Sequence, residues 1–250
     1  NIAETSLTIP DIRVVIDTGI EKIARFDPQT GVIELRPVPI SRVSAEQRAG
    51  RAARIAPGLC LRLWSEEEQA QRPIVRPPEI LRSDLGRVIL LFRSMGIDLA
   101  SVDLLDHPGP ERIRAIERSL TALGALSPEG EITPLGKHIA SLPLEPQLGR
   151  MVVEGIRQGC VDEIVTIAAL NSTSRLFYFP RGKEEEARRA HLPFQKAAQE
   201  GGSSYLGLLA AWREVRQAGF NPAFCHERFL NARAFREAGS IRRQILAALK

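Results

Sequence analysis

Cysteine is scarce in this sequence, with 3 residues among 250, at positions 60, 160 and 225. They lie far apart and none belongs to a C-x-x-C pair, so the sequence predicts neither a disulfide framework nor a zinc or other metal site. This usage is typical of a reducing compartment, and we expect an intracellular protein, cytoplasmic or nuclear. Apolar runs of membrane length are also missing, as is a signal peptide, so no membrane partner is expected.

Hydrophobic residues, by contrast, make up 44% of the chain, which is enough for real cores. A length of 250 residues allows two or three small domains. The formal net charge is +4, with a sequence pI near 9.2. This mildly basic balance is compatible with a nucleic-acid partner and does not by itself require one.

The stretch with the clearest chemistry covers residues 44–54 and reads SAEQRAGRAAR. It predicts Ser44 as the N-cap of the helix that follows. On such a helix Gln47, Arg51 and Arg54 stand at i, i+4 and i+7, so their side chains share one face. Two guanidiniums beside a carboxamide suit the transfer of a phosphoryl group, because arginines neutralise developing charge and the amide orients water.

Small residues surround this face, since Gly50 and the neighbouring alanines add little bulk and let a large anion come close. Arg48 lies one residue out of phase and is expected to point elsewhere. The alternative interpretation is that Gln47 closes a capping box with Ser44 and that the arginines form an ordinary solvated face.

Two motifs connect this stretch to a known family. Residues 47–54, QRAGRAAR, resemble motif VI (QRxGRxGR) of the superfamily 2 helicases of the DEAH/RHA type. Residues 1–9, NIAETSLTI, resemble motif V of the same family. The motifs stand in the family's order with a suitable gap, and the departure in motif VI is Ala53, where the family usually has glycine. The resemblance implies an ATP-dependent RNA helicase, with these catalytic residues: Gln47, Arg51 and Arg54.

The resemblance also assigns residues to the nucleotide and to the nucleic acid. It implies that three small residues lie at bound ATP, which the family uses with Mg²⁺: Ser6, Thr8 and Gly50. The family often has Asp-Gly after motif V for a ribose contact, and the matching candidate here is Asp11, which follows a proline. Asn1 and Thr5 are implied on the RNA side, with loop capping as the alternative for Thr5.

The sequence has no G-x-x-x-x-G-K-[ST] loop and no Asp-Glu-Ala-His box, and its first residue is not methionine. We therefore expect a fragment of a longer protein. The phosphate-binding loop and most magnesium ligands would then lie in an N-terminal RecA-like domain of the same protein. The fragment alone is not expected to hydrolyse ATP.

The first segment, residues 1–72, is expected to be the C-terminal part of a second RecA-like domain. Residues 12–17 predict a buried strand, and residues 59–64 predict a further strand at the edge of the sheet. Between them, residues 21–26 and 32–37 flank a turn that contains Asp-Pro and Gly, and so predict a β-hairpin.

The predicted hairpin carries three basic residues, Lys22, Arg25 and Arg36. In the DEAH family a hairpin at this place touches the nucleic acid where the duplex opens. The resemblance therefore implies that these side chains contact RNA, and an ordinary charged surface hairpin is the alternative.

Residues 73–142 predict a winged-helix domain after a proline-rich boundary. The expected elements are helices at 80–95 and 110–123, a wing at 126–132 and a helix capped by Thr133. The run from 131 to 152 resembles the family's L-T-x-L-G-x-x-x-A-x-x-P-x-x-P-x-L-x-x-M signature. A spacer that holds its neighbours together, rather than a reader of bases, is the interpretation that we favour.

Residues 143–250 predict a helical bundle, which the family calls the ratchet domain. Helices are expected at 148–157, 162–170, 206–215 and 224–235. The charge-rich residues 184–189 are interpreted as a solvated loop or short helix. Arg233 matches a basic family position at the RNA channel, and a salt bridge within the bundle explains it about as well.

Together these patterns predict a partial α/β RecA-like domain with a β-hairpin, followed by mainly α winged-helix and helical-bundle domains. The expected partners are RNA, the N-terminal RecA-like domain and a G-patch-type activator, which in eukaryotic members docks on the winged helix. The alternative is a non-catalytic nucleic-acid-binding scaffold with a relic helicase fold. A sequence-specific winged-helix regulator ranks last, because residues 115–121 supply only Arg118 to read bases.

Overall fold

The computed structural model describes residues 12–27, 32–52, 56–81, 83–173 and 175–249, and at 24–27 and 32–35 the backbone alone. The chain forms two compact units. The first comprises Asn1–Asp84 with Asp103–Pro108, and the second comprises Leu85–Val102 with Gly109–Lys250. None of the described helices is long and apolar enough to cross a membrane.

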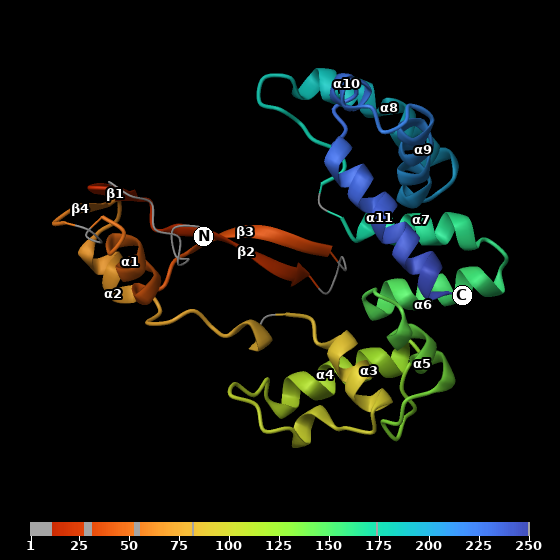
Figure 1. Cartoon of the computed structure of the whole chain (residues 1–250), viewed down its shortest axis with the longest axis horizontal. Coiled ribbons are helices and arrows are strands. Elements are labelled where there is room, and N and C mark those ends of the chain that lie inside the picture. The colour runs from red at the N-terminus through yellow and green to blue at the C-terminus, as the bar shows by residue number, and fades with distance from the viewer. Residues whose placement is uncertain (1–11, 28–31, 53–55, 82, 174, 250) are drawn as a thin grey trace. The chain divides into compact units, whose positions relative to one another are not determined.

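The described part of the first unit contains two separate pairs of strands and a few short helices (Figure 1). Its strands are β1 (Val14–Asp17), β2 (Ile20–Asp27), β3 (Val32–Pro39) and β4 (Leu59–Arg62). Its helices are α1 (Arg42–Ala49), α2 (Glu66–Gln71) and the 3-10 turn η2 (Glu79–Leu81).

Strands β2 and β3 form the predicted hairpin. They pair antiparallel from Ile20 opposite Pro39 to Asp27 opposite Val32, and the prediction is confirmed. Figure 1 shows them as one long two-stranded ribbon. Because side chains alternate between the two faces of a strand, the pairing places Lys22 on one face and Arg36 on the other.

Strands β1 and β4 pair in parallel, with Val14 opposite Leu59 and Asp17 opposite Arg62. The prediction of a strand before the hairpin is confirmed, but the prediction that it is buried is wrong. Val14 is 52% exposed and Ile16 is 65% exposed. The physical reason is that this described sheet has two strands, and no described element covers the face that carries their apolar side chains.

The second unit begins with the elements of the winged helix. They are α3 (Gly86–Ser94), the 3-10 turn η3 (Leu99–Ser101), α4 (Pro110–Ala122) and α5 (Pro134–Ser141). Leu126 pairs with Ile132 as a single antiparallel bridge, which forms the small predicted wing. Thr133 caps α5, as predicted, since its hydroxyl accepts from the backbone N–H of Gly136 at 2.9 Å.

One predicted helix of this region, residues 80–95, is wrong. The chain forms the short turn η2, leaves helical geometry, and enters α3 only at Gly86. Ser83, Asp84 and Gly86 lie within four residues at the break, and all three are weak helix formers. Leu85, Ile89 and Leu90 then provide the buried side of α3.

The rest of the second unit is a helical bundle. Its helices are α6 (Pro146–Arg157), α7 (Val161–Asn171), α8 (Glu184–Glu200), α9 (Ser204–Gln217), α10 (Pro222–Glu227) and α11 (Ala232–Ala248). The core gathers apolar side chains from most of these helices, among them Val152, Val165, Phe194, Trp212, Phe235 and Ile245. Gly159, with a φ of +74°, separates α6 from α7 as the sequence predicts.

Two predictions in the bundle are wrong. The charge-rich residues 184–189 are not a loop or short helix but the first turns of α8, a helix of 17 residues that buries Ala187, His191 and Phe194. The helix predicted at 224–235 is two helices, α10 and α11. The chain breaks because Phe229 has a φ of +53°, and its carbonyl accepts from the backbone N–H of Tyr178 at 3.1 Å instead of continuing a helix.

Helices α6 and α7 come close together at a glycine. A Cβ added at Gly155 would lie 2.8 Å from the Cβ of Ile164, which is nearer than two carbon atoms normally pack. Gly239 in α11 is different, because its nearest neighbour would be 3.6 Å away, at the Trp212 ring. The packing therefore leaves no room for a side chain at Gly155, whereas Gly239 could carry a methyl group.

We therefore expect opposite effects from the same substitution. Gly155→Ala should lower the free energy of unfolding by about 1–3 kcal/mol, because the added methyl group overpacks the helix contact. Gly239→Ala should raise it by about 0.5–1 kcal/mol, because alanine favours the helix. Denaturant unfolding followed by circular dichroism measures both, and equal effects of the two variants would contradict the helix packing.

Candidate functional site

Helix α1 carries part of the motif VI resemblance, and its boundaries differ from the prediction. The N-cap is Ser41 and not Ser44, because the Ser41 hydroxyl accepts from the backbone N–H of Ser44 at 3.1 Å. Ser44 is a buried residue of the first turn. The neighbouring chain favours the earlier start, since the N–H groups of Arg42 and Val43 donate to the carbonyls of Pro73 and Ile74.

The earlier start rules out the capping box between Ser44 and Gln47. The helix also ends earlier than predicted, at Ala49, with Gly50 as the C-cap. The turn after it tightens, because Arg51 N donates to Arg48 O at 3.1 Å. Arg51 therefore lies beyond the helix, and the prediction that Gln47 and Arg51 share one continuous helical face is wrong. Arg54, the third residue of that predicted face, lies outside the described residues.

The structure describes only part of the predicted nucleotide site. Gln47 and Gly50 are exposed, and Arg51 is half-buried in the turn that follows α1. Their roles stay predictions. The remaining predicted residues of motifs V and VI lie outside the described residues: Asn1, Thr5, Ser6, Thr8, Asp11 and Arg54.

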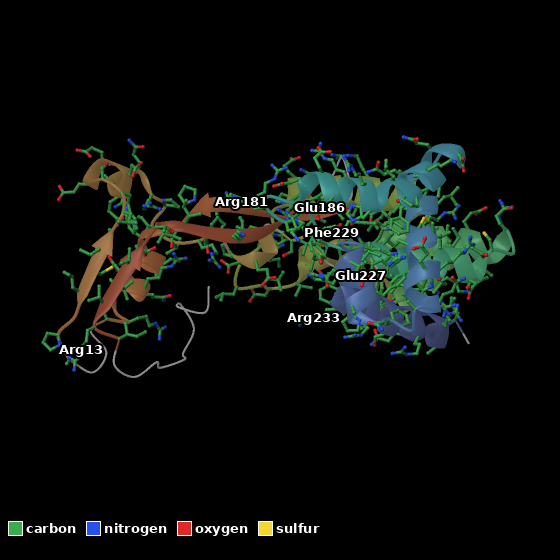
Figure 2. The ribbon with its side chains drawn as sticks, turned by 90° about the horizontal axis from the view of Figure 1, so that it is seen from above. Arg13, Arg181, Glu186, Glu227, Phe229 and Arg233 are labelled. Carbon is green, nitrogen blue, oxygen red and sulfur yellow. The ribbon has the colours of Figure 1, made fainter. Side chains whose placement is uncertain are left out.

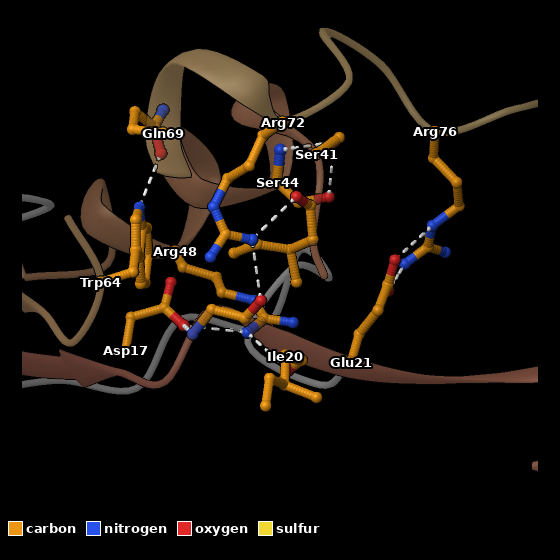
Figure 3. Close-up of polar contacts among 12 residues, drawn as sticks. Asp17, Ile20, Glu21, Ser41, Ser44, Arg48, Trp64, Gln69, Arg72 and Arg76 are labelled. Atoms are coloured by element: carbon orange, nitrogen blue, oxygen red, sulfur yellow. Dashed lines mark hydrogen bonds and ion pairs between the residues drawn. The ribbon is translucent and has the colours of Figure 1, made fainter. Parts of the chain in front are cut away.

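Arg48 makes the main polar contact between α1 and the strands, although the sequence assigned it no role. Its Nη1 donates to Oδ1 of Asp17 at 3.0 Å and to the carbonyl of Ile20 at 3.2 Å (Figure 3). The Asp17 side chain is 2% exposed and that of Arg48 is 12% exposed. Both partners are therefore largely removed from water, where a charge-assisted hydrogen bond is strong.

A second arginine, Arg72, holds the same junction from the other side. Its Nη1 donates to the carbonyl of Gly19 at 2.9 Å and to that of Ile40 at 3.1 Å. Its guanidinium lies over the Trp64 ring, 4.3 Å from the centroid, in a cation–π contact. Figure 3 shows Trp64 held in turn by its indole N–H, which donates to Gln69 at 2.8 Å.

The hairpin has a second ion pair near its base and exposed charges beside it. Glu21 is buried and binds Arg76, whose Nε lies 3.1 Å from Oε1 (Figure 3). Lys22 and Arg36 are exposed, as a nucleic-acid contact requires. Arg25 pairs with Glu34 in the strand register, and its side chain lies outside the described part.

A shallow hollow of about 570 Å³ lies beside the junction of β1 and β2. Its lining is Val15, Ile16, Asp17, Thr18, Ile20, Glu21, Lys22 and Arg48. The two carboxylates in this lining are each bound to an arginine, so they hold the fold together rather than offer a general acid or base. Across the described residues, no group of three or more His, Cys, Asp or Glu side chains could hold a metal ion.

In the second unit, Arg233 is exposed near the start of α11 (Figure 2). It is open to an RNA contact, and no ion pair to Arg233 is found among the described residues. Nearby basic residues are used internally instead. Arg236 donates to the carbonyl of Phe220 at 3.1 Å, and Arg242 binds Asp162 and Thr166 of α7.

Two pKa shifts in the second unit bear on the question of catalysis. Hydrogen bonds from Arg157, Gln158 and Arg150 lower the pKa of Glu154 to about 2. Burial raises the pKa of the Cys225 thiol, which makes that cysteine a poor nucleophile. Neither group indicates acid–base or nucleophilic catalysis in the second unit.

Comparison with known proteins identifies the region. Residues 117–144 match the family described as helicase associated domain (HA2), winged-helix, and residues 145–221 match helicase associated domain (HA2), ratchet-like. The chain is 38% identical over 248 residues to the Pre-mRNA-splicing factor ATP-dependent RNA helicase prp22 of Schizosaccharomyces pombe. The alignment covers 98% of this chain and 21% of that protein.

The chain is a DEAH/RHA-type helicase C-terminal region. The predicted family is thereby confirmed, together with its helicase-associated winged-helix and ratchet-like domains. The first unit lies outside the two matched domains, and so do residues 85–102, 109–116 and 222–250 of the second unit.

Four residues of the helicase region that hold the hairpin base were not predicted from the sequence: Asp17, Glu21, Arg72 and Arg76. Their partners lie tens of residues away along the chain, so no local spacing indicates the pairs. One signal was available for Asp17. An acidic residue that ends a β-branched run, just before Thr-Gly, is a poor strand residue unless it bonds the turn.

The N-cap assignment can be tested with three alanine variants. Ser41→Ala should lower the free energy of unfolding of the first unit by about 1 kcal/mol, because α1 loses the acceptor for its first N–H groups. Gln47→Ala, the matched control, should leave it nearly unchanged. Denaturant unfolding followed by Trp64 fluorescence, in a Trp212→Phe background, measures this. A larger loss from Ser44→Ala than from Ser41→Ala would contradict the cap.

Proposed function

We propose that this chain forms part of an ATP-dependent RNA helicase that couples ATP hydrolysis to movement along RNA and to unwinding. The observation that carries the proposal is the 38% identity to prp22, which is named as an ATP-dependent RNA helicase. The alignment runs over 248 residues and so extends well beyond the two matched domains, through the motif V and motif VI resemblances. The chain spans 21% of that relative, so the activity of the whole protein belongs to the proposal.

On the nucleotide side, this chain would supply the motif V and VI half of the ATP site. Gln47 would orient the attacking water, and Arg51 and Arg54 would neutralise charge on the transferring phosphoryl group. The exposure of Gln47 and Gly50 beside α1 supports this, because both are accessible to a large anion. The residues proposed to contact the rest of ATP are Ser6, Thr8, Gly50 and Asp11.

Magnesium would accompany ATP, as in other phosphoryl-transfer enzymes. The described residues contain no cluster of metal-binding side chains, so we place its ligands mostly in the N-terminal RecA-like domain. That domain is the proposed partner that closes the site. The exposed apolar side chains of β1 and β4 support a larger RecA-like sheet, of which these two strands would be a part.

On the nucleic-acid side, basic residues from both units would contact RNA phosphates, with the salt dependence that such contacts bring. The proposed residues are Asn1, Thr5, Lys22, Arg25, Arg36 and Arg233. The exposure of Lys22, Arg36 and Arg233 supports this assignment. We retain the proposed domain limits at 1–72, 73–142 and 143–250, a G-patch-type activator as a candidate partner, and a nuclear or cytoplasmic location.

The role of motif VI is tested by Arg54→Ala in the full-length protein. We expect kcat for ATP to fall by about a hundredfold or more, because an arginine finger contributes about 10³-fold or more to phosphoryl transfer. RNA binding without nucleotide should stay within about twofold, since Arg54 is assigned to ATP and not to RNA. Steady-state ATP turnover and RNA binding measure the two effects.

The matched control is Arg87→Ala, which removes an exposed arginine of α3 in the second unit. It should leave kcat unchanged. Turnover of Arg54→Ala within about threefold of the unmodified protein would refute the assigned role of Arg54, since a missing arginine finger costs far more than that.

A further inference from the structure

The junction between β1 and β2 is a sharp bend that the chain holds from several directions. Gly19 lies at the bend with a φ of +71°, in the region that favours glycine. Oδ1 of Asp17 accepts from the backbone N–H of Gly19 at 2.9 Å. A Cβ at Gly19 would also meet the Arg72 guanidinium at 2.4 Å and the Trp64 ring at 2.7 Å. The bend is therefore closely enclosed.

Helix α1 is attached to the hairpin base at two separate points. The first is the chain itself, because β3 ends at Pro39 and the N-cap of α1 is Ser41, only two residues later. The second is Arg48, which returns from the far end of α1 to the start of β2. Seven residues of helix separate Ser41 from Arg48, which corresponds to about 10 Å along the axis. Two attachments that far apart restrict rotation of the hairpin against α1.

The second attachment spans the bend. One nitrogen, Nη1, reaches both Oδ1 of Asp17 and the carbonyl of Ile20, on the two sides of the bend. The planar guanidinium is well suited to such a bridge, whereas a lysine ammonium is a compact point charge on a flexible stem. Arg72 also holds the bend, because it donates to the carbonyls of Gly19 and Ile40. The backbone N–H of Ile40 donates to the Gly19 carbonyl as well, at 3.0 Å.

We propose that Arg48 is a positioning residue that joins α1 and the β2–β3 hairpin into one mechanical body, so that a nucleotide-driven shift of α1 moves the hairpin's basic residues. The proposal rests on the proposed function, because it assigns ATP to the α1 side and RNA to the hairpin. Arg48 itself contacts neither. It acts by fixing the angle at the bend, through which displacement of α1 would reach Lys22 and Arg36.

The first test measures the bend directly, in the 250-residue chain. Arg48→Lys keeps the positive charge but loses the bridge, so hydrogen exchange at the Gly19 and Ile40 amides should accelerate by about tenfold or more. The matched control is Arg93→Lys, which alters a half-buried arginine that binds Glu117 at 2.6 Å within the second unit. That control should leave both amides unchanged. If Arg48→Lys does not fold, Asp17→Asn replaces it, and any acceleration specific to the two amides supports the proposal.

The second test measures coupling, in the full-length protein. With Arg48→Lys, RNA-stimulated ATP turnover should stay within about threefold, while duplex unwound per ATP should fall by about fivefold or more, because a small misplacement at the hairpin has a large effect. Arg93→Lys should leave the ratio of unwinding to turnover unchanged. A merely stabilising role for Arg48 would lower both rates together.

The outcomes separate the two proposals. Unchanged exchange at Gly19 and Ile40, or an unchanged ratio of unwinding to turnover, overturns the role of Arg48 and leaves the helicase proposal standing. If the unmodified full-length protein neither hydrolyses ATP nor unwinds RNA, the proposed function falls, and coupling through Arg48 falls with it. Accelerated exchange would then support only the structural bridge.

Discussion

The first unit depends on one buried interaction, the bond between the Arg48 guanidinium and the Asp17 carboxylate. Asp17 ends β1, its side chain turns back to bond Gly19, and Arg48 brings the end of α1 to the same carboxylate oxygen. A buried carboxylate without a partner is strongly unfavourable, so the arginine and the bend must form together. This constraint places α1, β1 and the hairpin base in one arrangement, although β1 pairs with a single strand among the described residues.

The second unit is held together differently, by apolar packing. Its core runs through most helices of the bundle, and close contacts at glycines let helices approach one another. At Gly136 a Cβ would lie 2.0 Å from the carbonyl oxygen of Ala125, so α5 must pack directly against the backbone just before the wing. Such dry, well-packed contacts make a rigid frame. A rigid frame suits a region that positions RNA for a motor, as the proposed function requires.

Much of the fold could be predicted because its boundaries have local chemical causes. Pro110 and Pro134 begin helices, Gly124 and Gly159 end them, and the Asp-Pro and Gly turn sets the hairpin. The incorrect predictions failed because contacts between distant parts of the chain decided the structure there. Ser41 and Ser44 are equally good caps by sequence, and the bonds from Arg42 and Val43 to residues 73 and 74 decide between them. The sequence did not indicate α8 as one long helix, because its buried side includes the polar residue His191 and because Pro193 stands in its interior.

The candidate site was predicted only in its motif residues. Gln47, Arg51 and Arg54 follow from a family pattern, but that pattern did not indicate that α1 ends at Ala49, before Arg51. Arg48 and Asp17 lie 31 residues apart, so only the folded chain brings them together. The helix period predicted only that Arg48 points away from Gln47, and the structure shows that it points to Asp17 and Ile20 at the base of the hairpin.

The most direct measurement of that connection is the distance between spin labels on α1 and on the hairpin. Labels at Glu46→Cys and Lys22→Cys, both exposed positions of the first unit, would be used in the full-length protein with its native cysteines replaced. We predict one narrow distance distribution that stays unchanged when an ATP analogue is added, and that broadens when Arg48→Lys is introduced. A broad distribution in the protein with Arg48 intact, or one that shifts with the nucleotide, would contradict a rigid connection between α1 and the hairpin.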